Sequence, residues 1–112
     1  MRIYIAGAYT ANTEDEILIN VNKAMDAGIK LFKKGHHPYV PHLCHWLDKR
    51  ANEIQIPLSY QNYMDYHMKW LMVSDAVLLI SHSKGADIEE TEAKRLWIPI
   101  YYKIEDVPVI KK

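Results

Sequence analysis

One continuously apolar segment constrains the fold of this chain more than any other feature. Residues 76–80 read Ala-Val-Leu-Leu-Ile, with Asp75 before them and the turn sequence Ser81-His-Ser-Lys-Gly85 after them. A strand without polar alternation is typical of a parallel sheet that is covered on both faces. We therefore expect residues 75–81 to form a buried strand of an α/β domain.

The rest of the chain alternates between strand-like and helix-like segments. β-branched and aromatic residues predict further strands at 2–6, 38–40 and 98–102. Apolar spacing and capping residues predict helices from Thr13 to Gly35, over 43–52, from Ser59 to about Val73, and from Asp87 to about Leu96. This order predicts a small doubly wound, flavodoxin- or Rossmann-like parallel sheet of four to five strands with helices on both faces. Residues 103–112 are expected to form an added strand or an oligomerisation arm.

Composition narrows the classes of function. The chain has 112 residues, 49% of them hydrophobic, with 14 basic and 14 acidic side chains. We expect one domain over residues 1–112, and the zero net charge excludes the basic footprint of a nucleic-acid or anionic-membrane binder. The single Cys indicates a reducing, cytoplasmic setting, and we expect neither a secretory signal nor a membrane span.

Right-handed crossovers bring the carboxyl ends of parallel strands to one edge of a sheet, where open α/β sheets bind ligands. Three segments should meet there: Gly7–Asn12, Pro41–His45 and His82–Glu89. We expect the candidate site at this edge.

The segment from Ser83 to Glu89 is the strongest candidate for chemistry. Ser83 and Gly85 lie between the buried strand and a helix start, where free N–H groups suit an anion. Glu89 shares a helix face with Ala93 and Leu96, which predicts that its carboxylate points inward. The structural alternatives are an ordinary turn and an acid that favours the helix dipole.

Four segments of the chain resemble one known family. Gly85-Ala-Asp-Ile-Glu-Glu-Thr-Glu-Ala93 followed by Ile98-Pro-Ile is similar to a signature of the nucleoside 2-deoxyribosyltransferase-like superfamily. The other three segments resemble its first strand and loop, its second strand and the entry to its third: Ile3-Tyr-Ile-Ala-Gly-Ala-Tyr9, Gly35-His-His-Pro-Tyr-Val-Pro-His42, and Tyr63-Met with Asp75-Ala-Val. The resemblance covers residues 2 to about 101.

This resemblance implies cleavage or transfer of the N-glycosidic bond of a 2′-deoxynucleoside or its 5′-monophosphate. Glu89 would be the nucleophile that attacks C1′, because a rigid carboxylate suits an oxocarbenium-like centre. Ser83 and Gly85, together with the first loop at Gly7, Ala8 and Thr10, would hold the 5′ end. The 5′-monophosphate N-glycosidases carry Ser and Arg where this chain has Ala8 and Thr10, so a charge would have to come from Lys84.

The chain also differs from the family's pattern at His67, a position at which the family usually has an Asp. His67 can serve as general acid on the departing base, as a core histidine, or as a sign that turnover has been lost. Tyr4, Tyr9 and His42 are the remaining expected pocket residues, with Tyr4 alternatively a buried strand residue.

A metal site is the rival hypothesis. His42, Cys44 and His45, with His36 and His37 upstream, offer imidazoles and a thiol without an established zinc spacing. We expect no metal and no cofactor, and we interpret His36 and His37 as residues that complement a helix C-terminus.

Two classes of function remain open from the sequence. The first is a nucleoside or nucleotide N-glycosidase or deoxyribosyltransferase; the second is a binding module of the same fold without turnover. In both, the partner is a small nucleoside or nucleotide and the chain forms a homodimer or larger oligomer. The sequence does not identify the base, the acceptor or the 5′ group.

Overall fold

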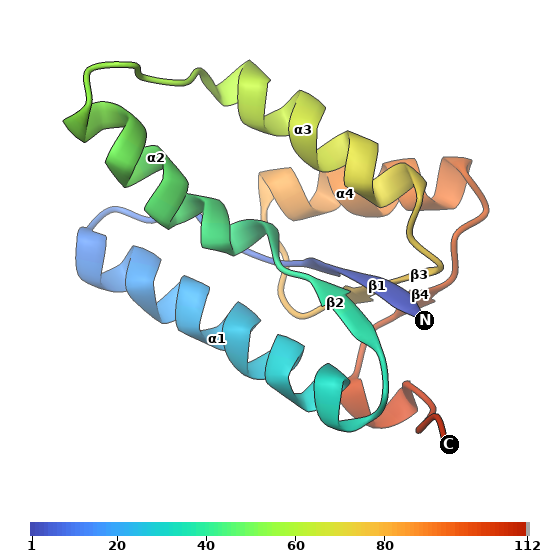
Figure 1. Ribbon diagram of the computed structural model, residues 1–112. Coiled ribbons are helices and arrows are strands. Elements are labelled where there is room, and N and C mark those ends of the chain that lie inside the picture. The colour runs from blue at the N-terminus through green and yellow to red at the C-terminus, as the bar shows by residue number, and fades with distance from the viewer. Residues whose placement is uncertain (112) are drawn as a thin grey trace.

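The fold is built on a four-stranded, all-parallel sheet with the strand order β2-β1-β3-β4 (Figure 1). The computed structural model describes residues 1–111. Its strands are β1 (Arg2–Ala6), β2 (His37–Tyr39), β3 (Ala76–Leu79) and β4 (Ile100–Tyr101). The expected doubly wound parallel α/β architecture is confirmed, with β1 and β3 at its centre.

Four α-helices and two short 3-10 helices connect and follow the strands among the described residues. They are α1 (Glu14–Lys33), η1 (Pro41–Leu43), α2 (Cys44–Glu53), α3 (Tyr60–Met72), α4 (Lys84–Arg95) and η2 (Ile104–Asp106). Thr13 and Ser59 cap α1 and α3 as expected, through bonds from the N–H groups of Glu16 and Asn62. Gly35 ends the first helical segment at φ +90°, a conformation that favours glycine.

The predicted start of α4 at Asp87 is wrong. The helix begins at Lys84, because the Ser83 hydroxyl accepts the Ala86 N–H at 3.0 Å and caps it one turn earlier. Both Ser83 and Asp87 are good N-cap residues, so local sequence does not choose between them. The strands are also shorter than expected at 75–81 and 98–102.

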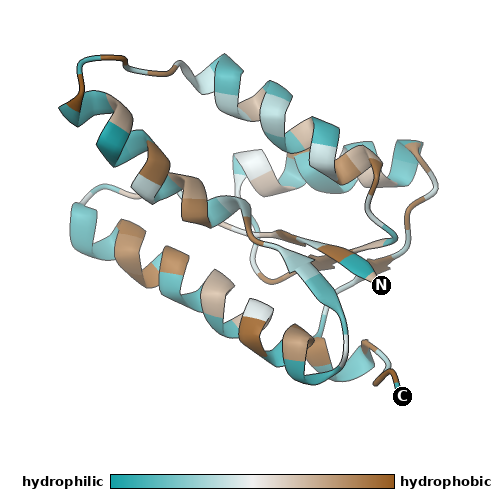
Figure 2. Cartoon of the chain, viewed as in Figure 1, coloured by the Kyte–Doolittle hydropathy of each residue, from teal (hydrophilic) through white to brown (hydrophobic). Residues whose placement is uncertain are grey.

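The two faces of the sheet bury different side chains. Ile3 and Ile5 of β1 point to the face covered by α1, where the core also contains Leu31 and Val107. Tyr4 and Ala6 point to the opposite face, in a cluster completed by Leu71 of α3, Val77 and Leu79 of β3, and Ala86 and Ala93 of α4. Figure 1 shows α1 on one side of the sheet and α3 and α4 on the other, and Figure 2 shows hydrophobic residues along α1 and in the central strands. Both faces are therefore covered, which explains the unbroken apolar run in β3.

The last described residues do not form the added strand that we expected, and an oligomerisation arm stays a prediction. Val107 is buried in the core beside α1, and the Ile110 N–H donates to the Lys34 carbonyl at 2.8 Å. His36 is 1% exposed, and its Nε2 lies 2.6 Å from the Pro108 carbonyl oxygen. The expectation that His36 merely complements a helix end is therefore wrong, because the imidazole ties the last segment to the sheet. Within residues 1–111, no helix combines the length and the apolar character that crossing a membrane requires.

Candidate functional site

Glu89 and Tyr4 form a buried polar pair between α4 and the sheet. Glu89 is 8% exposed and Tyr4 is fully buried, and the Tyr4 hydroxyl donates to Glu89 Oε2. The predicted inward direction of Glu89 is therefore confirmed. Tyr4 does not line an open pocket, and its place is behind the carboxylate, where its hydroxyl fixes one oxygen.

The environment of this pair shifts both proton equilibria. Burial raises the pKa of Glu89 to about 7, against the lowering effect of the Tyr4 hydrogen bond. Burial, and then the neighbouring Glu89 carboxylate, raise the pKa of Tyr4, so its phenol remains a donor. Glu89 is thus a rigid carboxyl group that changes charge near neutral pH, a property associated with catalytic carboxylates.

An aromatic wall extends from this pair towards α3. Tyr39 lies opposite Tyr4 in the parallel register, with the ring centroids 5.3 Å apart in an edge-on arrangement. The Tyr39 hydroxyl and His67 Nδ1 are hydrogen-bonded at 3.1 Å, and the Tyr63 ring stacks on His67 with its centroid 6.5 Å away. Burial, followed by the nearby His42, lowers the pKa of His67 to about 4. His67 is therefore neutral at pH 7, which favours a hydrogen-bonding role over the expected general acid.

The three segments expected at one edge of the sheet do meet there. The Ala8 N–H donates to Ser81 Oγ at 2.9 Å, which ties the first loop to the end of β3. His42, which is 4% exposed, lies 3.1 Å through Nε2 from the Gly7 carbonyl oxygen. A Cβ on Gly7 would lie 2.6 Å from Ile80 Cγ1, so a glycine is required where the loop passes β3.

A second polar chain runs beside His42 in the same edge. The Tyr9 hydroxyl lies 2.8 Å from His45 Nδ1, and His45 Nε2 lies 3.2 Å from Glu14 Oε1. Asn20 of α1 holds the Tyr9 backbone by donating to its carbonyl oxygen at 3.1 Å. The Tyr9 and His42 ring centroids are 6.4 Å apart. This chain therefore fixes Tyr9 next to His42.

The site consists of two adjoining polar groups. One contains Tyr4, Glu89, Tyr39 and His67, and the other contains Tyr9, His42, His45 and Glu14. Burial is the main cause that raises the pKa values of Tyr4, Tyr9 and Tyr39, and the Cys44 thiol adds to the shift in all three. His42 likewise contributes to the lowered pKa of His67. Ionisation of Cys44 would thus act on tyrosines of both groups, and protonation of His42 would act on His67.

The residues expected at the 5′ end of a substrate behave differently from one another. Ser83 Oγ is occupied as the α4 cap, and the Ala8 N–H is occupied by Ser81. A Cβ at Gly85 would meet no atom within 4 Å, so there is open space above the first turn of α4. Thr10 is exposed on the loop.

Three members of the site were not predicted from the sequence: Tyr39, His45 as a partner of Tyr9, and Glu14. Tyr39 had a usable signal, since an inward residue of a parallel strand next to Tyr4 shares its face. The pairing of His45 with Tyr9 and Glu14 had none, because these residues lie 36 and 31 positions from it.

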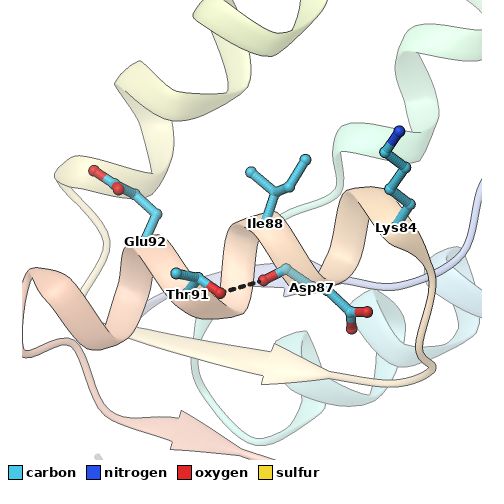
Figure 3. A pocket seen from close by; sticks show the side chains of 5 residues that line it. All are labelled: Lys84, Asp87, Ile88, Thr91 and Glu92. Carbon is cyan, nitrogen blue, oxygen red and sulfur yellow. Dashed lines mark hydrogen bonds between the residues drawn. The ribbon is translucent and has the colours of Figure 1, made fainter.

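Two open grooves lie elsewhere on the surface. One, of about 410 Å³, is lined by residues of α4: Lys84, Asp87, Ile88, Thr91 and Glu92. Figure 3 shows Lys84, Ile88 and Glu92 pointing away from the neighbouring strand, with the Thr91 hydroxyl bonded to the Asp87 carbonyl. The other, of about 400 Å³, lies beside α1 and η2. Neither contains Glu89, and Lys84, the expected source of charge for the 5′ end, lines the first of them.

One set of three potential metal ligands is found within residues 1–111, and it differs from the histidines considered above. Ligand atoms of His82, Asp87 and Glu90 lie within 4.8 Å of one another. His82 and Asp87 are exposed, and Glu90 accepts the Tyr102 hydroxyl at 2.6 Å and lies 3.8 Å from Lys94. The carboxylate of Glu90 is thus already engaged by a donor and a cation.

Comparison with known proteins identifies a family for the chain. Searches of curated proteins and of solved structures found no significant match. A family model described as "Domain of unknown function (DUF4406)" matches residues 1–102, a region that contains the four described strands and both polar groups of the site. The chain therefore belongs to the DUF4406 family.

Proposed function

We propose that this protein cleaves or transfers the N-glycosidic bond of a 2′-deoxynucleoside or its 5′-monophosphate, with Glu89 as nucleophile. The observation that carries the proposal is the buried Glu89 carboxylate, which Tyr4 holds between α4 and the parallel sheet. The resemblance to the nucleoside 2-deoxyribosyltransferase-like superfamily, centred on Gly85–Ala93, supports the same assignment.

The reaction has two steps in this proposal. An oxygen of ionised Glu89 forms a bond to C1′ while the bond from C1′ to the base nitrogen breaks, and its electron pair leaves with the base. The base gains a proton from water, because the pKa of His67 is lowered to about 4 and the residue is a neutral imidazole, not an acidic imidazolium, at neutral pH. Water or a second base then attacks C1′, loses a proton to the hydroxide left by the first step, and displaces Glu89 as a carboxylate. Tyr4 acts as a positioning residue because its hydroxyl holds the second carboxylate oxygen.

The start of α4 is the proposed contact for the 5′ end of the substrate. The first N–H groups of a helix have no acceptor within it, and Ser83 satisfies only those of Ala86 and Asp87. The N–H groups of Lys84 and Gly85, beside the open space over Gly85, fit a 5′-hydroxyl or phosphate oxygen. Lys84 is the nearby cation for a phosphate.

A binding module without turnover is the second candidate function. The observation that favours it is His67, a neutral, half-buried residue that is hydrogen-bonded to Tyr39. At the position of His67, the nucleoside 2-deoxyribosyltransferase-like superfamily usually has an Asp. Such a domain would retain the polar side chains of the site and bind the nucleoside without breaking the glycosidic bond.

We also propose a homodimer or larger oligomer. Aromatic side chains that a monomer leaves in water include Trp46 of α2 and Trp70 of α3, each about half exposed, and Trp97 at 92% exposure. Aromatic residues are enriched at protein interfaces, so these side chains are the candidate contacts between copies.

The experiment that tests the proposed function is a chromatographic assay for free base. The protein is incubated with the common 2′-deoxynucleosides and their 5′-monophosphates, with and without an acceptor base, and compared with Glu89→Ala. We expect release by the wild type and a loss of at least about a thousandfold in the variant. Glu92→Ala, on the groove side of the same helix, is the matched control and should retain activity.

The outcomes separate the two candidates. Dependence on the acceptor base identifies a transferase, and release without an acceptor identifies a hydrolase. Saturable binding without release supports the binding module, and the absence of both binding and release contradicts the proposed function.

A further inference from the structure

We propose that His42 and Tyr9 together form a hydrogen-bond acceptor pair that selects a substrate by a donor group, N–H or O–H, at that position. This specificity rests on the proposed function, because it concerns the nucleoside that Glu89 would attack. The direction of each hydrogen bond follows from what the partners of the two side chains are able to donate or accept.

The polarity of His42 is fixed by a backbone carbonyl. A carbonyl oxygen can only accept, so the nitrogen 3.1 Å from the Gly7 oxygen, Nε2, carries the proton. Burial lowers the pKa of His42, which keeps the imidazole neutral and leaves Nδ1 as a bare acceptor. This Nδ1 is buried and has no hydrogen-bond partner among residues 1–111. A buried acceptor without a partner is uncommon and costly, which points to a ligand donor.

The polarity of Tyr9 is fixed by a longer chain. The Glu14 carboxylate can only accept, so His45 donates through Nε2, and in the tautomer that carries its one proton there, Nδ1 is an acceptor. The Tyr9 hydroxyl must then donate its single proton to that Nδ1, at 2.8 Å. The Tyr9 oxygen can then only accept a hydrogen bond from a ligand. His45 is 7% exposed, so solvent does not readily exchange for this partner.

The two acceptors are neighbours at the edge of the sheet. Their rings lie 6.4 Å apart at an interplanar angle of 71°, beside the end of β1. A ligand carbonyl placed there could not form a hydrogen bond with either acceptor, because it has no proton to donate. An amino or hydroxyl group could donate to either acceptor. A deoxynucleoside offers such a donor from two sources, an exocyclic amino group of the base and a hydroxyl of the sugar.

The test measures binding to a Glu89→Gln variant, in which turnover is blocked. Isothermal titration compares 2′-deoxyadenosine with 2′-deoxyinosine and 2′-deoxycytidine with 2′-deoxyuridine, which exchange an amino group for a carbonyl. A third comparison, of 2′-deoxyadenosine with 2′,3′-dideoxyadenosine, removes a sugar hydroxyl. We expect at least about a tenfold loss in one of these arms, and the arm that shows it identifies the source of the donor.

Substitutions then connect that loss to the acceptor pair. Tyr9→Phe removes one acceptor and should reduce the preference several-fold, while Tyr102→Phe, which alters a hydroxyl bonded to Glu90 on the outer side, should not. Glu14→Gln is the sharper variant, because an amide can donate to His45 Nε2 and release the fixed direction of the Tyr9 proton. Glu14 is half exposed, so this change should fold, and it should lower the preference without removing any ring.

Equal binding of the paired ligands, or a preference that survives both Tyr9→Phe and Glu14→Gln, overturns the inference and leaves the proposed function standing. Failure of every nucleoside and 5′-monophosphate to bind contradicts both.

Discussion

The two faces of the sheet place opposite demands on the same strands. On the α1 face, Ile3, Ile5, Leu78 and Leu31 pack as an aliphatic layer with no ionisable group in the cluster. On the α4 face, Tyr4 of the same strand β1 carries a hydroxyl bonded to Glu89, an acid that burial has made reluctant to ionise. Neighbouring residues of β1 thus face an aliphatic layer on one side of the sheet and a buried carboxyl group on the other.

The two faces contribute differently to the stability of the fold. Aliphatic burial contributes about 25 cal/mol for each Å² removed from water. A buried carboxyl group works in the other direction once it ionises, since desolvation penalises its charge. We therefore expect substitutions on the α1 face to change stability without changing chemistry, and substitutions around Glu89 to change the proposed chemistry and the pH dependence of stability.

The largest loss of stability is expected from Leu31→Ala on the α1 face. Leu31 is fully buried, and a Leu→Ala change in a core lowers the free energy of unfolding by about 2–5 kcal/mol. Urea unfolding measures this loss, and base release per folded molecule should be unchanged. Phe32→Ala, at a side chain that is 63% exposed, is the control and should cost less than about 1 kcal/mol. Loss of activity in a fully folded Leu31→Ala protein would contradict the prediction that the α1 face affects stability alone.

Glu89→Gln should have a stability effect of similar size and opposite sign that depends on pH. The folded pKa of about 7 lies above the ordinary value of 4.5, so stability is full below pH 4.5 and falls as pH rises through 7. The wild type should lose about 3 kcal/mol between about pH 4 and pH 8, a loss that a glutamine does not share. Urea unfolding of both proteins at the two pH values checks this. A stability difference that is the same at both would show that Glu89 is not held in the shifted state.

Tyr4→Phe should act on chemistry more than on stability. The Tyr4 hydrogen bond lowers the pKa of Glu89, so its removal raises that pKa and leaves less ionised nucleophile at neutral pH. We expect kcat/KM to fall about tenfold, or about 1.4 kcal/mol, and its acidic limb to move to higher pH. The pH profile of base release is the measurement, with Tyr102→Phe as the matched control. An unmoved acidic limb would remove Tyr4 from the positioning role.

The smallest effect is expected outside both faces. Lys94 lies 3.8 Å from Glu90 on the outer side of α4 and is 64% exposed. Exposed ion pairs contribute about 0–1 kcal/mol and are screened by salt, so Lys94→Ala should change the free energy of unfolding by no more than about 0.5 kcal/mol. A larger change in urea unfolding, insensitive to salt, would mean that this outer side also carries stability.

Much of the architecture was predictable because its signals are local. The unbroken apolar run of β3, the caps at Thr13 and Ser59 and the glycine at position 35 each follow from a few neighbouring residues. The inward direction of Glu89 also followed, from helical spacing to Ala93. Where two local signals competed, as Ser83 and Asp87 did for the start of α4, the predicted residue was the wrong one.

Other parts of the structure depend on contacts between distant residues. His36 binds the Pro108 carbonyl 72 positions away, so the last segment is tied down where we expected an added strand. The Glu14–His45–Tyr9 chain and the bond from His42 to Gly7 likewise join separate elements. No periodicity or motif specifies which hydroxyl will meet which imidazole.

The sequence by itself determined the parallel α/β class, the inward direction of Glu89, and the gathering of three segments at one edge of the sheet. Only the tertiary structure decided that Tyr4 meets Glu89 across 85 residues, that His67 is neutral, and that the buried His42 Nδ1 has no partner among the described residues. The physical reason is range. Side-chain direction follows from the backbone period of a single element, whereas proton positions and pKa values follow from burial and partners that only the packing of several elements supplies.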